Sequence, residues 1–435
     1  MKPLAAQRRR GVGLLVCLMI LLSTLSGVSA GRFPGWPAGL CVWMVGALLA
    51  PSIARFQKVQ VAIMVAIGVA GLASALPQGA LRGWAALLEG NQAILAMLAT
   101  VSFLRLVARS GAHAGEQLPR GAKALLPTLL AVHLFGAIIN ISAVFVVGQR
   151  TSHDGSLTPL QAKVVSRAFV AAACWSPLFA SMAVVLHYVP QVNVPHVVKL
   201  NVLLAVSLLA YAAWDLRRTP HIEDFVGFPL HREALTAPAT LCALVLGIYS
   251  LTTVWSVLTI IVVAVFCCVA VLRLGKPWAE TRRLLWHHID RELPRMGGEF
   301  ALFIGATVLA AGIGAFAASH PLPWVVNPAD ALAGVPLLCL LVVVTLCGIH
   351  PVISVATLAS LFPAQLDAPD VLAAVVLMAW AITLGTSPVS GTTLAMQGRF
   401  GIPSTRFLRW NLSYSAAGLA SGCAILALAD YFGWA

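Results

Sequence analysis

The chain alternates between long apolar segments and short polar or basic stretches. An apolar helix needs about 20 residues to cross the roughly 30 Å of hydrocarbon in a bilayer. Runs at spanning length predict membrane helices at 11 to 30, 38 to 54, 59 to 76, 90 to 107, 124 to 148, 164 to 189, 199 to 214, 237 to 272, 299 to 317, 333 to 362, 371 to 397 and 410 to 431. The run 237 to 272 is too long for one span, so we expect two helices separated near Ser250 to Trp255.

Basic residues flank the run 124 to 148 on both sides. Before it stand Arg105, Arg109, Arg120 and Lys123, and after it stand Arg150, Lys163 and Arg167. Positive residues favour the cytoplasmic side of a membrane, so both ends of this run are expected there. A segment that leaves and returns on one side is a re-entrant hairpin.

The run 333 to 362 shows the opposite pattern. No Lys or Arg occurs from Trp324 through Met396, whereas Asp330, Asp367 and Asp370 lie at its flanks, so both ends are expected outside. With these two hairpins the chain has about eleven spans, a cytoplasmic N-terminus and a periplasmic C-terminus. This topology puts 25 of the 28 Lys and Arg residues on the cytoplasmic side, as expected of a multi-pass protein of a bacterial inner membrane.

Composition supports the same class and excludes others. Hydrophobic residues make up 60% of the chain and charged residues 10%, and the mean hydropathy is +0.90, so no soluble domain is left over. The net charge of +13 sets orientation in such a protein and does not indicate nucleic-acid binding. The nine Cys lie in apolar segments without CxxC spacing, and no metal, phosphate-loop or nucleophile motif occurs. The sequence therefore indicates neither an enzyme nor a resident cofactor.

The first segment has two interpretations. A basic start, an apolar stretch and the small residues Val28-Ser29-Ala30 are typical of a cleaved signal peptide. We favour a retained transmembrane helix within residues 1 to 37. The second span starts outside the cytoplasm in either case, so the remaining topology is the same.

Polar residues within the apolar runs recur at a nearly constant offset. Glu89 and Glu299 differ by 210 positions, as do Asn140 and His350, and Ser176-Pro177 and Ser387-Pro388 differ by 211. The surrounding spans have opposite predicted orientations, which indicates an inverted-topology repeat. The predicted organisation is an extra helix (1 to 37), a first repeat (38 to 214) with a cytoplasmic-side hairpin, a cytoplasmic linker (215 to 236), and a second repeat (237 to 431) with a periplasmic-side hairpin.

The repeat predicts a site inside the membrane. Proline removes a backbone donor and disfavours helix at the preceding residue, so both Ser-Pro steps are expected to interrupt their spans. Interrupted backbone at membrane depth is tolerated only where it is buried in protein or lines a wet cavity. Two hairpins and two broken helices that meet near the midplane would supply helix N-termini and hydroxyl groups. This combination suits an anion and its coupling cation.

This plan resembles the ion transporter superfamily, and within it most closely the divalent anion:sodium symporter family. The resemblance covers about residues 38 to 431. It implies a homodimer, an elevator-type motion, and a Ser-Asn-Thr motif at each hairpin tip that contacts substrate and sodium. By position the tips fall at Ile139-Asn140-Ile141-Ser142 and Ile349-His350-Pro351, with Ser354 beyond. The chain keeps the asparagine at the first tip, isoleucines flank it, and the second tip carries His350.

The candidate binding residues are the polar and proline residues of the tips and breaks. They are Asn140, Ser142, Ser176, Pro177, His350, Ser354, Thr386, Ser387, Pro388, Ser390 and Thr392. The candidates for coupling are His350, Glu299 and Glu89. The hydroxyl and amide residues could instead serve helix packing, the two glutamates could be interfacial residues at helix N-termini, and His350 could be satisfied by backbone at a tight turn.

The leading hypothesis is a secondary transporter of a small, anionic solute with H⁺ or Na⁺ as the coupling ion. The alternatives are a polytopic membrane enzyme that acts on a lipid-linked substrate, and a non-transporting subunit of a membrane complex. No Arg or Lys within the membrane marks an anion site in this interpretation, so selectivity is assigned to backbone dipoles and hydroxyls. The stretch Arg282 to Arg295 is expected to be an amphipathic linker on the cytoplasmic membrane surface.

Overall fold

The computed structural model describes residues 6–76, 84–107, 117–230, 236–252, 254–320, 330–361 and 368–434, which form helices and connecting turns with only two isolated β-bridges. The helices are α1 (Ala6–Val28), α2 (Trp36–Leu49), α3 (Arg55–Ser74), α4 (Trp84–Glu89), α5 (Gln92–Val101), α6 (Ala122–Ile139), α7 (Ser142–Thr151), α8 (Pro159–Val170), α9 (Ala180–Tyr188), α10 (Val194–Arg217), α11 (Thr236–Leu251), α12 (Val257–Arg273), α13 (Trp278–His287), α14 (Gly297–Ser319), α15 (Gly334–Leu346), α16 (Pro351–Leu361), α17 (Pro369–Thr383), α18 (Gly391–Phe400) and α19 (Ser404–Tyr431). Residues 1–5, 109, 231–235, 253, 362 and 367, to which the sequence-based predictions also extend, lie outside the described residues.

Seven helical stretches in the described chain are long and apolar enough to cross a membrane. They are Gln7–Val28, Arg55–Ser74, Leu87–Leu106, Ala122–Ile139, Val194–Arg217, Gly297–Ser319 and Ser404–Tyr431. Several further apolar helices are shorter, among them α12 and α17. The prediction of an all-α polytopic membrane protein is therefore confirmed. The number of spans, their orientation and the inverted repeat stay predictions.

Helices are interrupted where the sequence analysis expected. The run 237 to 272 divides into α11 and α12. Asn140 and Ile141 separate α6 from α7, and residues 347–350 separate α15 from α16. The two Ser-Pro steps lie between α8 and α9 and between α17 and α18. Each of these breaks leaves backbone groups that require partners within the protein.

Side chains also cap the backbone at the starts of several helices. Thr158 and Gln161 form a capping box at the start of α8, where Pro159 occupies the first helical position. Asn193 caps α10 and Ser256 caps α12 by accepting hydrogen bonds from backbone N–H groups of the first turn. These caps fix the start of three helices.

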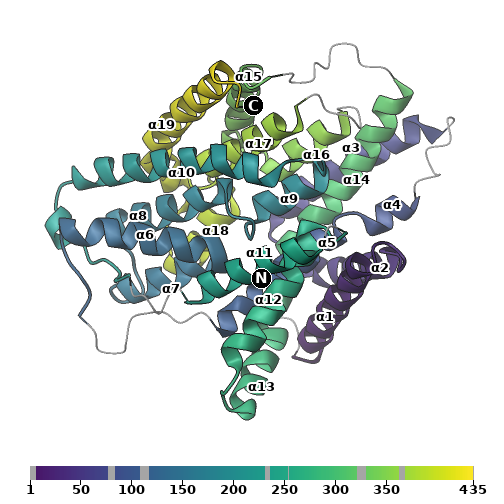
Figure 1. Ribbon diagram of the computed structural model, residues 1–435, viewed down its shortest axis with the longest axis horizontal. Helices are drawn as coiled ribbons and strands as arrows, with labels where there is room; N and C mark the ends of the chain where they lie inside the picture. Colours follow the sequence, from purple (N-terminus) through teal and green to yellow (C-terminus); the bar gives the residue numbers. More distant parts are fainter. Residues whose placement is uncertain are drawn as a thin grey trace.

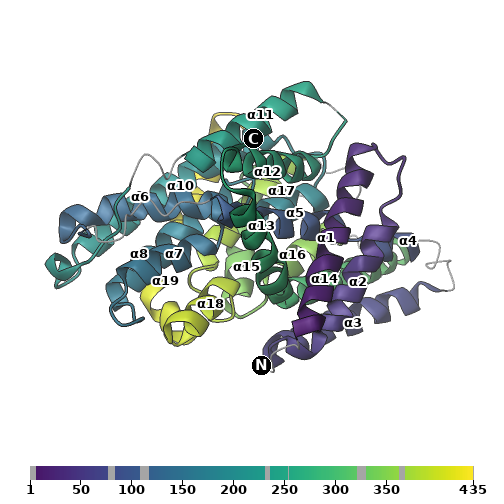
Figure 2. The ribbon, with the colours of Figure 1, turned by 90° about the horizontal axis from the view of Figure 1, so that it is seen from below.

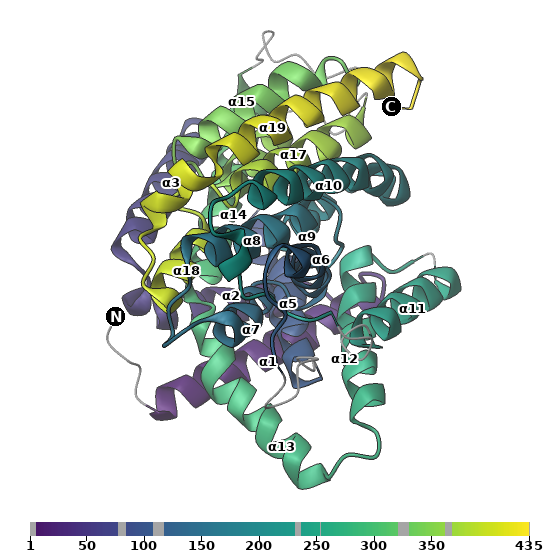
Figure 3. The same cartoon turned by 90° about the vertical axis from the view of Figure 1, so that its left-hand side faces the viewer.

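The helices form two bundles (Figures 1 and 2). The hairpin bundle consists of α6–α10 and α15–α19, and the flanking bundle consists of α1–α5 and α11–α14. Within the first, α6 packs on α8, α15 on α17 and α10 on α19; within the second, α3 packs on α14 and α12 on α5. The bundles meet chiefly where α16 lies against α14 and α9 against α5. Figure 3 shows α13 projecting from the molecule, away from α15 and α19.

The flanking bundle depends on a close crossing of α3 and α14. A Cβ on Gly312 would lie 2.0 Å from the carbonyl oxygen of Gly68, and one on Gly68 would lie 2.3 Å from the carbonyl oxygen of Val308. Only glycine allows the two backbones to approach this far. Small residues at such crossings are typical of membrane helices, where packing has to supply the association energy.

We expect Gly312→Ala to separate α3 from α14 and to lower the free energy of unfolding by roughly 1–3 kcal/mol, because the clash is with backbone that cannot rotate away. Thermal unfolding of the purified protein in detergent measures this. Gly314→Ala on the same helix is the control, since its Cβ would meet no atom closer than 4.0 Å. Equal melting temperatures for the two variants would contradict the crossing.

Candidate functional site

A cavity of about 440 Å³ lies between the two bundles. The hairpin bundle contributes both predicted hairpin tips and part of each broken helix to its wall. The flanking bundle contributes α5, the 3-10 turn Ser102–Leu106, the start of α14 and the segment just before it. Of the predicted site residues, Asn140, Ser142, His350, Thr392 and Glu299 line this cavity.

Four helix N-termini reach the cavity wall. Ser142 is the first residue of α7 and Ala180 the first of α9, while Val352 and Thr392 are the second residues of α16 and α18. Each of these helices follows one of the four breaks. A helix N-terminus carries unpaired N–H groups and about half a positive charge, so the wall is favourable to an anion.

The first hairpin tip is a strained turn. Asn140 has a φ of 53°, in the left-handed region that side chains other than glycine rarely adopt. Its Oδ1 accepts a hydrogen bond of 2.8 Å from the N–H of Ile141, which stabilises this turn. Ser142 follows at the start of α7, and its hydroxyl accepts a hydrogen bond from Nε of Arg105. The tip is thus connected to the flanking bundle across the cavity.

The second tip uses glycine and histidine. Gly348 has a φ of 103° and permits the turn, and Pro351 starts α16. The N–H of Val352 donates a 3.2 Å hydrogen bond to Nδ1 of His350. A neutral imidazole with this acceptor carries its proton on Nε2. The ring meets Trp380 edge to face at 5.8 Å, so Trp380 fixes its orientation in the cavity wall.

At the first Ser-Pro break, side chains form hydrogen bonds to the backbone and to one another. The hydroxyl of Ser176 donates to the carbonyl oxygen of Ala137 at 2.5 Å, and this connects the break to α6. The indole of Trp175 donates to Nε2 of His133, and Nδ1 of His133 is 3.1 Å from the carbonyl oxygen of Ala168. Ser176 is buried and does not line the cavity, and neither does Pro177.

Side chains also form hydrogen bonds at the second Ser-Pro break. The hydroxyl of Ser390 donates to the carbonyl oxygen of Leu384 at 2.6 Å and accepts from the N–H of Thr393. Thr386 shares a 2.6 Å hydrogen bond with Ser415 of α19. Among the described residues, those predicted for the site that stay outside the cavity lining are Ser176, Pro177, Ser354, Thr386, Ser387, Pro388, Ser390 and Glu89. The hydrogen bonds of Ser176, Ser390 and Thr386 fit the alternative interpretation, in which these residues serve helix packing.

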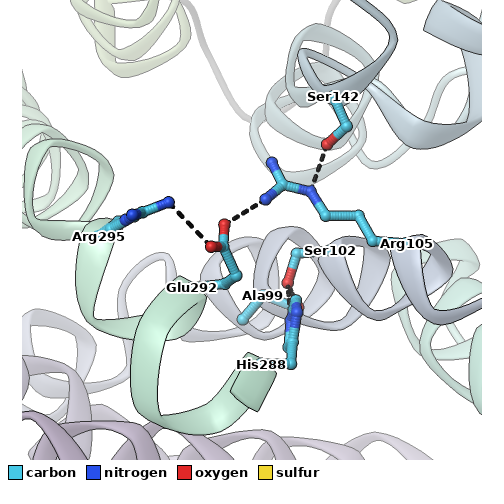
Figure 4. Close-up of polar contacts among 7 residues, drawn as sticks. All are labelled: Ala99, Ser102, Arg105, Ser142, His288, Glu292 and Arg295. Carbon is cyan, nitrogen blue, oxygen red and sulfur yellow. Dashed lines mark hydrogen bonds and ion pairs between the residues drawn. The ribbon is translucent and has the colours of Figure 1, made fainter. Parts of the chain in front are cut away.

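Charged residues that the sequence analysis did not assign to the site line the cavity. Arg105 lies in the last turn of the helical stretch that contains α5, and Glu292 and Arg295 belong to the segment just before α14. Arg105 forms an ion pair with Glu292, and Arg295 pairs with the other oxygen of that carboxylate at 2.8 Å (Figure 4). The expectation that no arginine marks the site is therefore wrong. The sequence feature that could have pointed to Arg105 as a site residue is its position within a predicted span.

The end of the stretch Arg282 to Arg295 packs against the protein. A π-helical turn, His288–Glu292, follows α13 and directs this segment against α1 and the cavity. His288 is only 2% exposed and lies 2.8 Å from the hydroxyl of Ser102. That hydroxyl donates to the carbonyl oxygen of Ala99, so Nε2 of His288 is the donor to Ser102. Burial, together with the nearby charge of Arg105, lowers the pKa of His288 to about 4.

Comparisons with known proteins add one structural likeness. No protein-family model matches the chain, and no curated protein matches its sequence. Among solved structures, the chain is similar to the crystal structure of the YdaH transporter of Alcanivorax borkumensis, with 13% identity, a TM-score of 0.38, and coverage of 98% of this chain and 99% of that chain. The evidence for function therefore lies in the cavity and its residues.

We expect the protein to lose stability as the pH falls from about 6.5 to about 4, because the unfolded chain binds a proton at His288 that the folded protein does not. The full effect is up to about 3 kcal/mol. Melting temperatures at several pH values measure it. His288→Gln should flatten this dependence, whereas His153→Gln, at an exposed position, should leave it unchanged. Parallel pH profiles for all three proteins would contradict the assignment.

Proposed function

We propose that the protein is a secondary active transporter that moves a small anionic solute across the membrane, coupled to H⁺ or Na⁺, by an elevator-type mechanism. The observation that carries the proposal is the convergence of four helix N-termini on one cavity between two bundles. Arg105 and Arg295 place two guanidinium groups in the opposite wall, together with the carboxylates of Glu292 and Glu299. An anion bound there would be stabilised from both bundles at once.

The division into bundles supports the elevator mechanism. Both tips and both breaks belong to the hairpin bundle, so a solute bound at their helix ends could travel with that bundle past the flanking one. The second hairpin packs along α14 through α16, whereas Arg105 connects the first hairpin to the flanking bundle across the cavity. The side chain of Arg295 is 73% exposed and marks the mouth of the cavity. We assign this mouth to the cytoplasmic side, in agreement with the charge pattern.

The packing of the two halves supports the inverted repeat. The helix pair α6 and α8 corresponds to α15 and α17, and the pair α5 and α12 corresponds to α14 and α3. We further propose that the protein acts as a homodimer in the inner membrane. The coupling site we favour is Glu299 with His350, because both line the cavity, whereas Glu89 lies against the start of α2 and does not.

In proteoliposomes we expect accumulation of at least one anion when an inward H⁺ or Na⁺ gradient is imposed. Asn140→Ala, which removes the acceptor that stabilises the first tip, should reduce initial uptake about tenfold, since the loss of this partly buried hydrogen bond costs roughly 1–2 kcal/mol. Thr219→Ala lies in a connecting turn outside the cavity lining and is the control. No gradient-dependent uptake across a panel of organic and inorganic anions would refute the proposal.

The hairpins can be tested separately by accessibility in a cysteine-free background. We expect single cysteines at Ser152, after α7, and at Arg120, before α6, to react with an impermeant thiol reagent from the cytoplasmic side only. Cysteines at Asp330 and Asp370, on either side of the second hairpin, should react from the periplasmic side only. If the two members of either pair react from opposite sides, the corresponding segment is a full span.

A further inference from the structure

One carboxylate in the cavity wall is already held as a bound anion would be. Glu292 presents one oxygen to Arg105 and the other to Arg295. Its side chain is 19% exposed, and all three residues line the cavity. Two guanidinium groups share this carboxylate, and Glu299 is a second carboxylate in the same wall. An oxyanion that binds Arg105 therefore has to take a position that the protein's own carboxylate occupies.

Arg105 connects this cluster to the hairpin bundle. Its Nε donates to the hydroxyl of Ser142 at the start of α7, while its terminal nitrogen donates to Glu292 (Figure 4). The guanidinium is planar, with donors in a fixed fork that matches the two oxygens of an oxyanion. An oxyanion at Arg105 would thus lie next to the N-terminus of α7 as well, which adds a second favourable interaction.

If Arg105 released Glu292, Arg295 would remain as the counter-ion of Glu292. Glu292 and Arg295 are three residues apart on consecutive turns, so their 2.8 Å contact does not depend on Arg105. Glu292 is also the last residue of the π-helical turn, and such turns are irregular helix segments often found at functional sites. The exchange therefore leaves Glu292 paired with Arg295.

We propose that Glu292 is an internal competitor for the solute: an oxyanion that presents two oxygens displaces Glu292 from Arg105, and Glu292 stays with Arg295. This inference rests on the proposed function and names the group that the anion contacts. This competition lowers the affinity for the solute, since binding has to break the Arg105–Glu292 pair. It also allows Arg105 to remain paired when the cavity is empty, which avoids an unpaired charge beside the bilayer interior.

The test is oxyanion binding to the full-length protein in detergent. Acetate, inorganic phosphate and sulfate are titrated at constant ionic strength, with chloride as an anion that lacks two oxygens, and the melting temperature is followed. We expect at least one oxyanion to stabilise the protein more than chloride does. Glu292→Gln should lower the half-saturating concentration of that oxyanion about tenfold, which corresponds to a pair worth roughly 1.4 kcal/mol. Arg105→Gln should abolish the response.

Matched controls separate this effect from a general change of charge. Glu280→Gln breaks a similar ion pair with Arg273, at 3.0 Å, outside the cavity lining, and should leave oxyanion binding unchanged. Arg105→Lys keeps the charge without the fork and should bind more weakly than the wild type. It also keeps the inference testable if Arg105→Gln does not fold. The inference is overturned if no oxyanion stabilises the wild type or Glu292→Gln, or if Glu292→Gln binds no tighter than Glu280→Gln.

The inference and the proposed function fail in different ways. Uptake in proteoliposomes with an unchanged half-saturation constant in Glu292→Gln would overturn the inference and leave the transport function standing. Tighter oxyanion binding in Glu292→Gln without gradient-dependent uptake would support the inference and overturn the transport function.

Discussion

The structure depends on hydrogen-bonding the backbone wherever a helix is interrupted at membrane depth. Lipid offers no partners there, and each unpaired group costs several kcal/mol. The side chains of Ser176 and Ser390 serve the breaks from within the hairpin bundle. At Gly385 the partner comes from α19, because Asn411 donates a 2.6 Å hydrogen bond to its carbonyl oxygen. Once these groups are satisfied, the helix ends beyond the breaks can face a cavity.

Asn411 also connects the two broken spans to each other. Its Oδ1 accepts from Nε of Arg167 on α8, and Arg167, only 1% exposed, pairs with Asp215 of α10 at 2.6 Å. A lone buried arginine would be costly, so these partners are what allows it to lie inside the bundle. The result is one polar network that fixes α8, α10, α19 and the second break relative to one another. The network thus holds three helices of the hairpin bundle together, as the proposed elevator-type motion would require.

The sequence was sufficient for the parts of the site that rest on local chemistry. The Ser-Pro steps predicted both breaks because proline cannot continue a helix, and the spacing of Asn140 and His350 predicted two tips that do line one cavity. It could not predict the ion pairs. Arg105 and Glu292 are 187 positions apart, and Arg105 was counted only as a residue that sets orientation. The amphipathic pattern of Arg282 to Arg295 fits a membrane surface as well as a segment that turns inward, and only the packing of the π-helical turn on α1 distinguishes the two.

The two walls of the cavity offer different kinds of attraction. In the hairpin bundle the polar part of the wall consists of helix N-termini and the side chains of Asn140, Ser142, His350 and Thr392, which carry partial charges. In the flanking bundle the polar part of the wall includes full charges, those of Arg105, Glu292, Arg295 and Glu299. The contact between Arg105 and Ser142 connects the two walls, so the proposed elevator-type motion would have to break it.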